Sequence, residues 1–339
     1  MAYVYNQIMT KKILLLITFI GLCFSANAQV LRKRTTLLMG SRWQFSIVAA
    51  DSLSAEQHID KSIAEVARIE YLISDWKPAS QVSQVNANAG IGPIKVDREV
   101  FDLTVRALQL SAMTEGAFDI SFAAMDRIWK FDGSMTVMPS PELIAKSVEK
   151  VGYKNIILDS VNSTIFLKLK GMKIGFGALG EGYAADKCRE MMLNMGIKAG
   201  IVNGSGDMST WGKQPNGEDW TIGITNPFRN DSLITIIPLR EGAVVTSGSY
   251  EKFVSFHGKR YSHIINPSTG YPASGLVSVT IFGPSTERAN GFSTSMMVLG
   301  GVEALNFIRK YPEYRYILIT EKGEIISSPS LNLKRRRLK

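Results

Sequence analysis

Cysteine and histidine are scarce in this sequence, which has two cysteines and three histidines among 339 residues. It contains no CxxC pair, no HExxH motif and no GxSxG turn, so the usual signatures of thiol-redox proteins, zinc proteases and serine hydrolases are absent. His58, His257 and His263 are too scattered to predict a zinc site. Apolar residues make up 45% of the chain, which is enough for a core and excludes disorder throughout.

The first 28 residues have the pattern of a secretory signal peptide. Lys11 and Lys12 precede an apolar run that ends at Cys23, and Ala26 and Ala28 form an Ala-x-Ala end. The run is shorter than the roughly 20 apolar residues that a transmembrane helix needs. We predict cleavage after Ala28 and export, with a lipid anchor on Cys23 as the alternative.

The chain that remains after cleavage is moderately basic, with 37 basic against 30 acidic side chains. Five of the basic groups lie in the tail, residues 331–339, which we interpret as a frayed, solvated end in preference to a membrane contact. No basic patch is interleaved with aromatic residues, so no nucleic-acid partner is expected. Cys188 is the one cysteine left, which excludes a disulfide or a cysteine-based metal site.

The spacing of apolar residues predicts an α+β fold with a mostly antiparallel sheet, because helices and strands do not alternate regularly. We expect one domain over residues 30–330, with Ser54 as the N-cap of its first helix. Expected helices span residues 54–73, 98–114, 141–152, 181–195 and 288–310. Expected strands span residues 37–50, 200–203, 220–225, 233–239, 243–246, 252–257 and 276–282, with hairpins at 155–169 and 314–326.

Glycine-rich and polar clusters mark the candidate functional segments. Residues 175–183 lead directly into a predicted helix, where free backbone N–H groups favour an anion. The GxGxxG spacing there lacks the βαβ context of a dinucleotide fingerprint, so the spacing alone favours a plain turn. Further clusters lie at 203–207, 246–250 and 262–270, the last containing His263, which from the pattern alone is as well explained as a structural side chain.

The last cluster places polar oxygens on one helical face. Asn290, Ser293 and Thr294 stand at i, i+3 and i+4. Such oxygens suit a hard cation such as Mg²⁺, although helix capping explains the same pattern. The residues alone therefore indicate an exported α+β protein with phosphate-friendly turns and a candidate hard-metal site.

Read in order, these clusters resemble the FAD:protein FMN transferase family, also called the ApbE-like flavin transferases. The likeness covers about residues 38–328 and rests on eight blocks in the family's order. The blocks are Met39-Gly40-Ser41; Ile73 to Pro78 with Ser80 and Asn86; Gly116 to Ile120; Gly180 to Asp186; Asn203 to Asp207; Thr246 to Tyr250; Ser262 to Gly270; and Ala289 to Gly300.

The resemblance implies a periplasmic, Mg²⁺-dependent enzyme. It would cleave FAD, join FMN through a phosphoester to a threonine of an acceptor protein and release AMP. Acceptors in the family are typically subunits of membrane redox complexes. If Cys23 carries a lipid, the protein would be attached to the inner membrane.

The resemblance also implies roles for individual positions. His263 would be the base for the acceptor threonine. The remaining candidates would contact the flavin nucleotide or the cation. The nucleotide contacts would be Met39, Trp76, Ala117, Phe118, Asp119, Gly175, Glu181 and Ile265, and the metal contacts Ala178 (through its carbonyl), Asn290, Ser293 and Thr294.

Two departures from the family pattern lower the negative charge expected near the cation. Gly175 and Asn290 stand where the family usually has aspartate, and a neutral ligand binds Mg²⁺ more weakly than a carboxylate. Asp119, Glu181 and Asp207 are the acids that remain to compensate. The alternatives to transfer are an FAD-binding protein with little chemistry, and a hydrolase that yields FMN and AMP.

Overall fold

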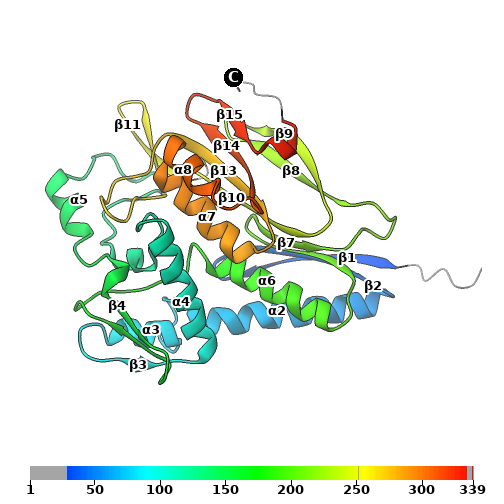
Figure 1. Cartoon of the computed structure of the whole chain (residues 1–339), viewed down its shortest axis with the longest axis horizontal. Coiled ribbons are helices and arrows are strands. Elements are labelled where there is room, and N and C mark those ends of the chain that lie inside the picture. Colours follow the sequence, from blue (N-terminus) through cyan, green and yellow to red (C-terminus); the bar gives the residue numbers. More distant parts are fainter. Residues whose placement is uncertain (1–28, 251, 334–337, 339) are drawn as a thin grey trace, which may run out of the picture.

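The computed structural model describes residues 29–250, 252–333 and 338 (Figure 1). Its elements follow the chain in this order: β1 (Val30–Leu38), β2 (Ser41–Ala49), α2 (Ser52–Ile73), α3 (Gln81–Ala87), β3 (Ile94–Lys95), α4 (Arg98–Met113), η1 (Ile120–Ala124), α5 (Pro141–Ser147), η2 (Tyr153–Asn155), β4 (Ile156–Asp159), β5 (Thr164–Leu167), α6 (Gly180–Asn194), β6 (Ala199–Gly204), β7 (Asp207–Trp211), β8 (Trp220–Asn226), β9 (Arg229–Leu239), β10 (Gly242–Gly248), β11 (Phe253–Phe256), β12 (Lys259–Ser262), β13 (Leu276–Gly283), α7 (Thr286–Leu299), α8 (Gly301–Ile308), β14 (Arg315–Thr320), β15 (Ile325–Ser327) and η3 (Pro329–Leu331).

An eight-stranded antiparallel sheet in the order β1-β2-β6-β7-β10-β13-β14-β15 forms the centre of the fold. Helices α2, α6 and α7 pack against one of its faces, and the β8–β9 hairpin packs on the other (Figure 1). The period-2 alternation of β14 explains how one strand serves both layers: Tyr316 and Leu318 enter the helical core, whereas Ile317 and Ile319 contact the hairpin. The predicted α+β class with a mostly antiparallel sheet is confirmed.

The first hairpin begins earlier than the sequence pattern indicates. One strand was expected over 37–50, but β1 and β2 pair with a two-residue turn at Met39 and Gly40. Both turn residues have positive φ, 52° and 74°, as the twist-compatible type I′ turn requires. The Met39 N–H donates to Glu70 on α2, which fixes the turn against that helix.

Helix α2 is capped by Asp51 and not by Ser54. The Asp51 carboxylate accepts from the Ser54 backbone N–H at 2.8 Å, so Ser54 lies inside the first turn. The expectation for Ser54 was wrong because Asp, three residues earlier, is at least as good an N-cap and its extended backbone admits one more turn.

This assignment predicts unequal effects of two substitutions. Asp51→Ala leaves a first-turn N–H without its acceptor and should lower the free energy of unfolding by about 1 kcal/mol. Ser54→Ala retains that backbone donor and should change stability by less than about 0.5 kcal/mol. Urea denaturation of the two variants measures the difference, and a larger loss for Ser54→Ala would contradict the assignment.

The expected helix over 288–310 is two helices, α7 and α8, joined at Gly300. Gly300 has φ 74°, which breaks helical geometry and is tolerated because glycine lacks a Cβ. Helix α5 likewise ends at Ser147, before the expected Gly152.

Helices α6 and α7 approach unusually closely. A Cβ at Gly182 would lie 2.6 Å from the Thr286 carbonyl oxygen, so only glycine permits this packing. The carboxylate of Asp186 joins three elements here: it accepts from Ser209 on β7, from the Ser285 hydroxyl and from the first backbone N–H groups of α7. A negative group at a helix start is stabilised by the unpaired amides.

The structure describes none of the predicted signal peptide and only part of the basic tail at the two ends of the chain. The predicted signal peptide and Cys23 lie outside the described residues. Of the basic tail, Leu338 donates its N–H to the Gly323 carbonyl and packs against the β8–β9 layer, which a frayed end would not do. Within the described ranges no helix has the length and apolarity to cross a membrane. Cys188 is a buried free thiol.

Candidate active site

A pocket with a cavity volume of about 470 Å³ gathers most of the predicted site residues from segments far apart in the chain. Met39 lines an adjoining pocket that shares Trp76, Gly177 and Glu181 with the first. Ser293 lines neither. The predicted residues that line the main pocket are Trp76, Ala117, Phe118, Asp119, Gly175, Ala178, Glu181, His263, Ile265, Asn290 and Thr294.

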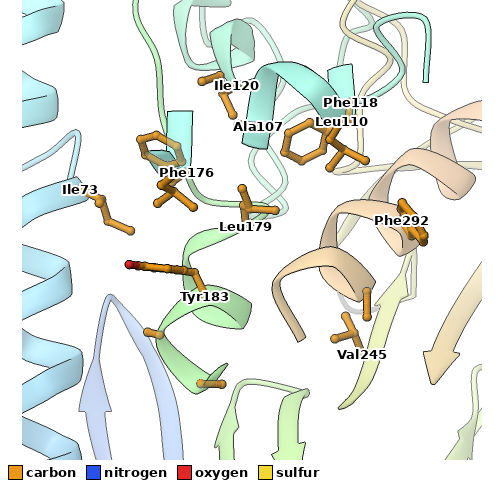
Figure 2. Packing of buried hydrophobic residues seen from close by; sticks show 14 of the residues in the cluster. Ile73, Ala107, Leu110, Phe118, Ile120, Phe176, Leu179, Tyr183, Val245 and Phe292 are labelled. Carbon is orange, nitrogen blue, oxygen red and sulfur yellow. The ribbon is translucent and has the colours of Figure 1, made fainter. Parts of the chain in front are cut away.

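Apolar anchors hold these segments in the core. Phe118, Phe176, Leu179 and Phe292 are each less than 5% exposed and pack in one cluster (Figure 2). Each anchor is adjacent in sequence to predicted site residues, so the backbone of the pocket wall is fixed by the burial of its neighbours. This explains why short polar segments without regular structure keep a defined position.

The turn after α2 presents Trp76 at the pocket mouth. The Ser74 hydroxyl accepts from the backbone N–H groups of Trp76 and Lys77, which fixes the turn. Trp76 itself is 68% exposed, and the Arg127 guanidinium lies 4.0 Å from the centre of its ring. An exposed indole with a cation on its face is a suitable stacking platform for a planar heterocycle.

Side-chain hydrogen bonds position the two loops that flank the mouth. The Asn86 amide pairs with the backbone of Ile174 in both directions, at 2.9 and 2.8 Å, next to Gly175. The Asp119 carboxylate accepts from the N–H and hydroxyl of Ser121 and from the Tyr153 N–H. Burial raises the pKa of Asp119, and these hydrogen bonds oppose the shift. Its carboxylate is therefore committed to holding the loop.

A buried carboxylate orients the amide of Asn290. The Asn290 Nδ2 group donates to Asp207, so the amide oxygen, Oδ1, is the atom left to accept or to coordinate. Burial raises the pKa of Asp207 well above the usual range, and the nearby carboxylates of Glu181 and Asp186 raise it further. Burial also raises the pKa of Glu181, against a hydrogen bond from Ser41 and the charge of Lys252.

Ser293 lies behind the pocket wall. Its side chain is fully buried, and its hydroxyl donates to the Asn290 carbonyl and bonds to the Ser247 hydroxyl. Thr294 from the next position does line the pocket. The structure thus brings Ala178, Asn290 and Thr294 to the pocket and leaves Ser293 as a support that joins α7 to β10.

His263 also lines the pocket and lies just after β12. Its Nδ1 lies 3.0 Å from the Lys252 carbonyl oxygen. A carbonyl only accepts, so Nδ1 carries the proton and Nε2 carries the basic lone pair of the neutral ring. The Phe131 ring contacts the imidazole edge-on at 6.4 Å between centres. These contacts fix the tautomer and the orientation of a candidate base.

Sequence reasoning missed several residues that line the pocket. Asp75 lies in one of the segments that resemble the family, but the pattern predicts no role for it, and it predicts only a turn for Thr246, Ser247 and Gly248. A signal for Asp75 exists: it is an acid directly before an aromatic residue at a helix end. Ser205 and Ile264 carry no signal that distinguishes them from loop and core residues.

The candidate cation donors are neutral oxygens. Among the described residues, no group of three or more His, Cys, Asp or Glu is placed to hold a metal ion. The predicted donors that line the pocket are the Asn290 amide, the Thr294 hydroxyl and the carbonyl of Ala178, and carboxylates line it beside them. Oxygen donors of this kind suit Mg²⁺ in preference to softer transition metals.

The fold and the pocket together define a class: an α+β protein whose site combines hard oxygen donors, a helix start and an oriented histidine. The ApbE family model matches residues 39–318. A FAD:protein FMN transferase from Salmonella typhimurium is 31% identical over 306 residues, covering 88% of this chain and 86% of that protein. The chain therefore belongs to the ApbE family, and its enzyme class is that of the transferases.

Solved structures agree with this assignment. An ApbE protein from Thermotoga maritima superposes with a TM-score of 0.81 at 29% identity, covering 91% of this chain and all of that one. The flavinyl transferase ApbE from Pseudomonas stutzeri gives a TM-score of 0.77 at 25% identity, covering 88% and 94%.

Proposed function

We propose that this protein is a Mg²⁺-dependent FAD:protein FMN transferase that attaches FMN to a threonine of an acceptor protein and releases AMP. The observation that carries the proposal is the convergence of eleven predicted residues, from five separate segments, on one pocket. The name of the Salmonella typhimurium relative, FAD:protein FMN transferase, supports the same reaction.

The proposed reaction is a transfer at phosphorus. The threonine hydroxyl oxygen attacks the phosphorus on the FMN side of the FAD anhydride, a new P–O bond forms, and the bond to the AMP oxygen breaks. His263 Nε2 takes the hydroxyl proton. Trp76 stacks on a planar ring of the dinucleotide at the mouth. The unpaired backbone N–H groups at the start of α6, near Ala178 and Glu181, would donate hydrogen bonds to the phosphate oxygens.

Ala178, Asn290 and Thr294 are the residues that would hold the cation, which when bound neutralises charge on the phosphate oxygens. The donor set fits this task because Asp207 turns the Asn290 amide so that oxygen, and not nitrogen, remains available. The ligands themselves are neutral, so the affinity for Mg²⁺ should be modest.

Asn290→Asp tests this donor set. A second carboxylate beside Asp207 should raise the affinity for Mg²⁺ on the order of tenfold at pH 8, since ligand charge increases affinity. The gain should shrink at pH 6, because two carboxylates in contact share a proton that the cation must displace. Isothermal titration at both pH values measures this, and an unchanged titration would remove Asn290 from the ligand set.

The acceptor and the location are further parts of the proposal. A subunit of a membrane redox complex is the proposed acceptor. The signal-like pattern of residues 1–28 supports export to the periplasm, with attachment to the inner membrane if Cys23 is lipidated. Residues 30–330 would form the catalytic domain.

Incubating the purified chain with FAD, Mg²⁺ and a threonine-bearing acceptor of the family tests the reaction. The acceptor should become fluorescent and gain the mass of one FMN, with AMP in equal amount. Free FMN with AMP would instead identify a hydrolase. Bound FAD with no AMP, unaffected by EDTA, would identify a binding protein; either of these results would overturn the proposal.

A further inference from the structure

Asp75 is the acid at this pocket whose carboxylate makes no hydrogen bond or ion pair with a described residue. It is exposed at the mouth and lines both the main and the adjoining pocket. The other pocket acids are engaged: Asp119 with Ser121 and Tyr153, Asp207 with Asn290, and Glu181 with Ser41. Asp75 is therefore the charge most available to something that enters the pocket.

The geometry around Gly175 shows how closely this carboxylate approaches the opposite wall. A Cβ built on Gly175 would lie 3.2 Å from Asp75 Oδ2, 3.5 Å from its Cγ and 3.0 Å from the Ala123 Cβ. The carboxyl group of Asp75 thus fills the space into which a side chain at position 175 would project. The negative charge beside position 175 is therefore supplied by Asp75, which lies on the turn after α2.

The neutral donors make this charge consequential. An amide, a hydroxyl and a carbonyl contribute no net charge, and the carboxylates of Asp119 and Asp207 are occupied by hydrogen bonds within the protein. A nearby carboxylate without such partners would therefore strengthen the binding of a divalent cation, because opposite charges attract strongly where water is partly excluded.

We propose that Asp75 supplies the negative charge for the cation held by Ala178, Asn290 and Thr294, in the place that an acidic side chain at position 175 would otherwise serve. This inference rests on the proposed function insofar as it assumes the cation. It adds a residue that the sequence pattern did not assign and a reason why Gly175 is compatible with a working site.

A direct binding measurement tests the inference apart from catalysis. The probe is Mn²⁺, followed by the electron paramagnetic resonance signal of the free ion in a titration with protein. Asp75→Asn, which keeps the shape of the side chain, should raise the Kd for Mn²⁺ on the order of tenfold. The matched control is Asp126→Asn, an exposed aspartate that does not line the pocket, which should leave the Kd within about twofold.

Relocating the carboxylate gives a second, more specific test. Asp75→Ser should weaken Mn²⁺ binding like Asp75→Asn. Adding Gly175→Asp should restore the Kd to within about threefold of the original, because the Asp75 carboxylate no longer fills the space beside position 175 and the Ala123 Cβ remains as the close neighbour that must shift. Gly175→Asp alone should not improve binding, since two carboxylates would compete for one space. Thermal melting verifies that each variant is folded.

The outcomes separate the inference from the proposed function. Equal Mn²⁺ affinity in the unaltered protein and Asp75→Asn overturns the role of Asp75, as does a folded double variant that fails to recover binding. If the unaltered protein binds no Mn²⁺, the cation dependence in the proposed function fails with it. If Mn²⁺ binding depends on Asp75 but no FMN reaches an acceptor, the inference stands and the transfer reaction falls.

Discussion

Replacing His263 with alanine should slow FMN transfer by about 10²–10⁴-fold while FAD binding changes by less than about twofold, because a positioned general base contributes a factor of this size. The hydrogen bond from Nδ1 to the Lys252 carbonyl leaves Nε2 as the proton acceptor. The hydroxyl of a threonine needs such a base, whereas binding of the dinucleotide relies on other walls of the pocket.

Single-turnover transfer to the acceptor and FAD titration by fluorescence measure the two effects separately. His257→Asn is the matched control: His257 is exposed at the tip of the β11–β12 hairpin with φ 50°, a conformation that asparagine tolerates, and it does not line the pocket. Its transfer rate should match that of the unaltered protein. Loss of FAD binding in proportion to transfer in His263→Ala would refute the assignment as a base.

Replacing Asp207 with asparagine should stabilise the metal-free protein by about 2 kcal/mol at pH 8 while weakening its affinity for Mg²⁺. The carboxylate is buried, and its pKa is raised first by burial, then by Glu181 and Asp186. A carboxylic acid whose pKa is raised on folding binds more protons in the folded state than in the unfolded state. Stability is therefore lost as pH rises above the unfolded pKa of about 4.

The sign of this effect makes the test specific. Asparagine does not titrate, so the two proteins should have similar unfolding free energies near pH 4 and diverge as the pH rises. Urea denaturation in EDTA at pH 4.5, 6 and 8 measures the divergence, and Asp126→Asn serves as an exposed control. A constant difference across pH, or a less stable variant at pH 8, would refute the assigned cause.

The sequence predicted the site better than it predicted the ends of elements. The resemblance to the family named eleven residues that line one pocket. The short segments that carry them are fixed by adjacent apolar anchors such as Phe118 and Leu179, whose patterns are local. The sequence pattern did not predict the start of α2 or the break at Gly300. Several neighbouring residues could serve as the N-cap of α2, and several glycines could adopt a positive φ, so the pattern does not show which one does.

Contacts between segments were beyond the sequence pattern. Nothing local shows that the Asn290 amide meets Asp207, 83 residues away, or that Ser293 turns toward Ser247. The position of Asp75 against Gly175 is of the same kind: it follows from how the turn after α2 packs on the loop before α6. These contacts decide which of several polar residues face the pocket.

The geometry of the pocket depends on Asp186, a residue that does not line it. Asp186 lies on α6, the helix that carries Glu181, and its carboxylate is outside the cavity. It nevertheless bonds to β7, which begins at Asp207, and to the start of α7, which carries Asn290 and Thr294. This one side chain thus holds α6, β7 and the start of α7, which form three sides of the cavity, in position relative to each other. A variant lacking this carboxylate would lose transfer activity although it replaces no residue that lines the cavity.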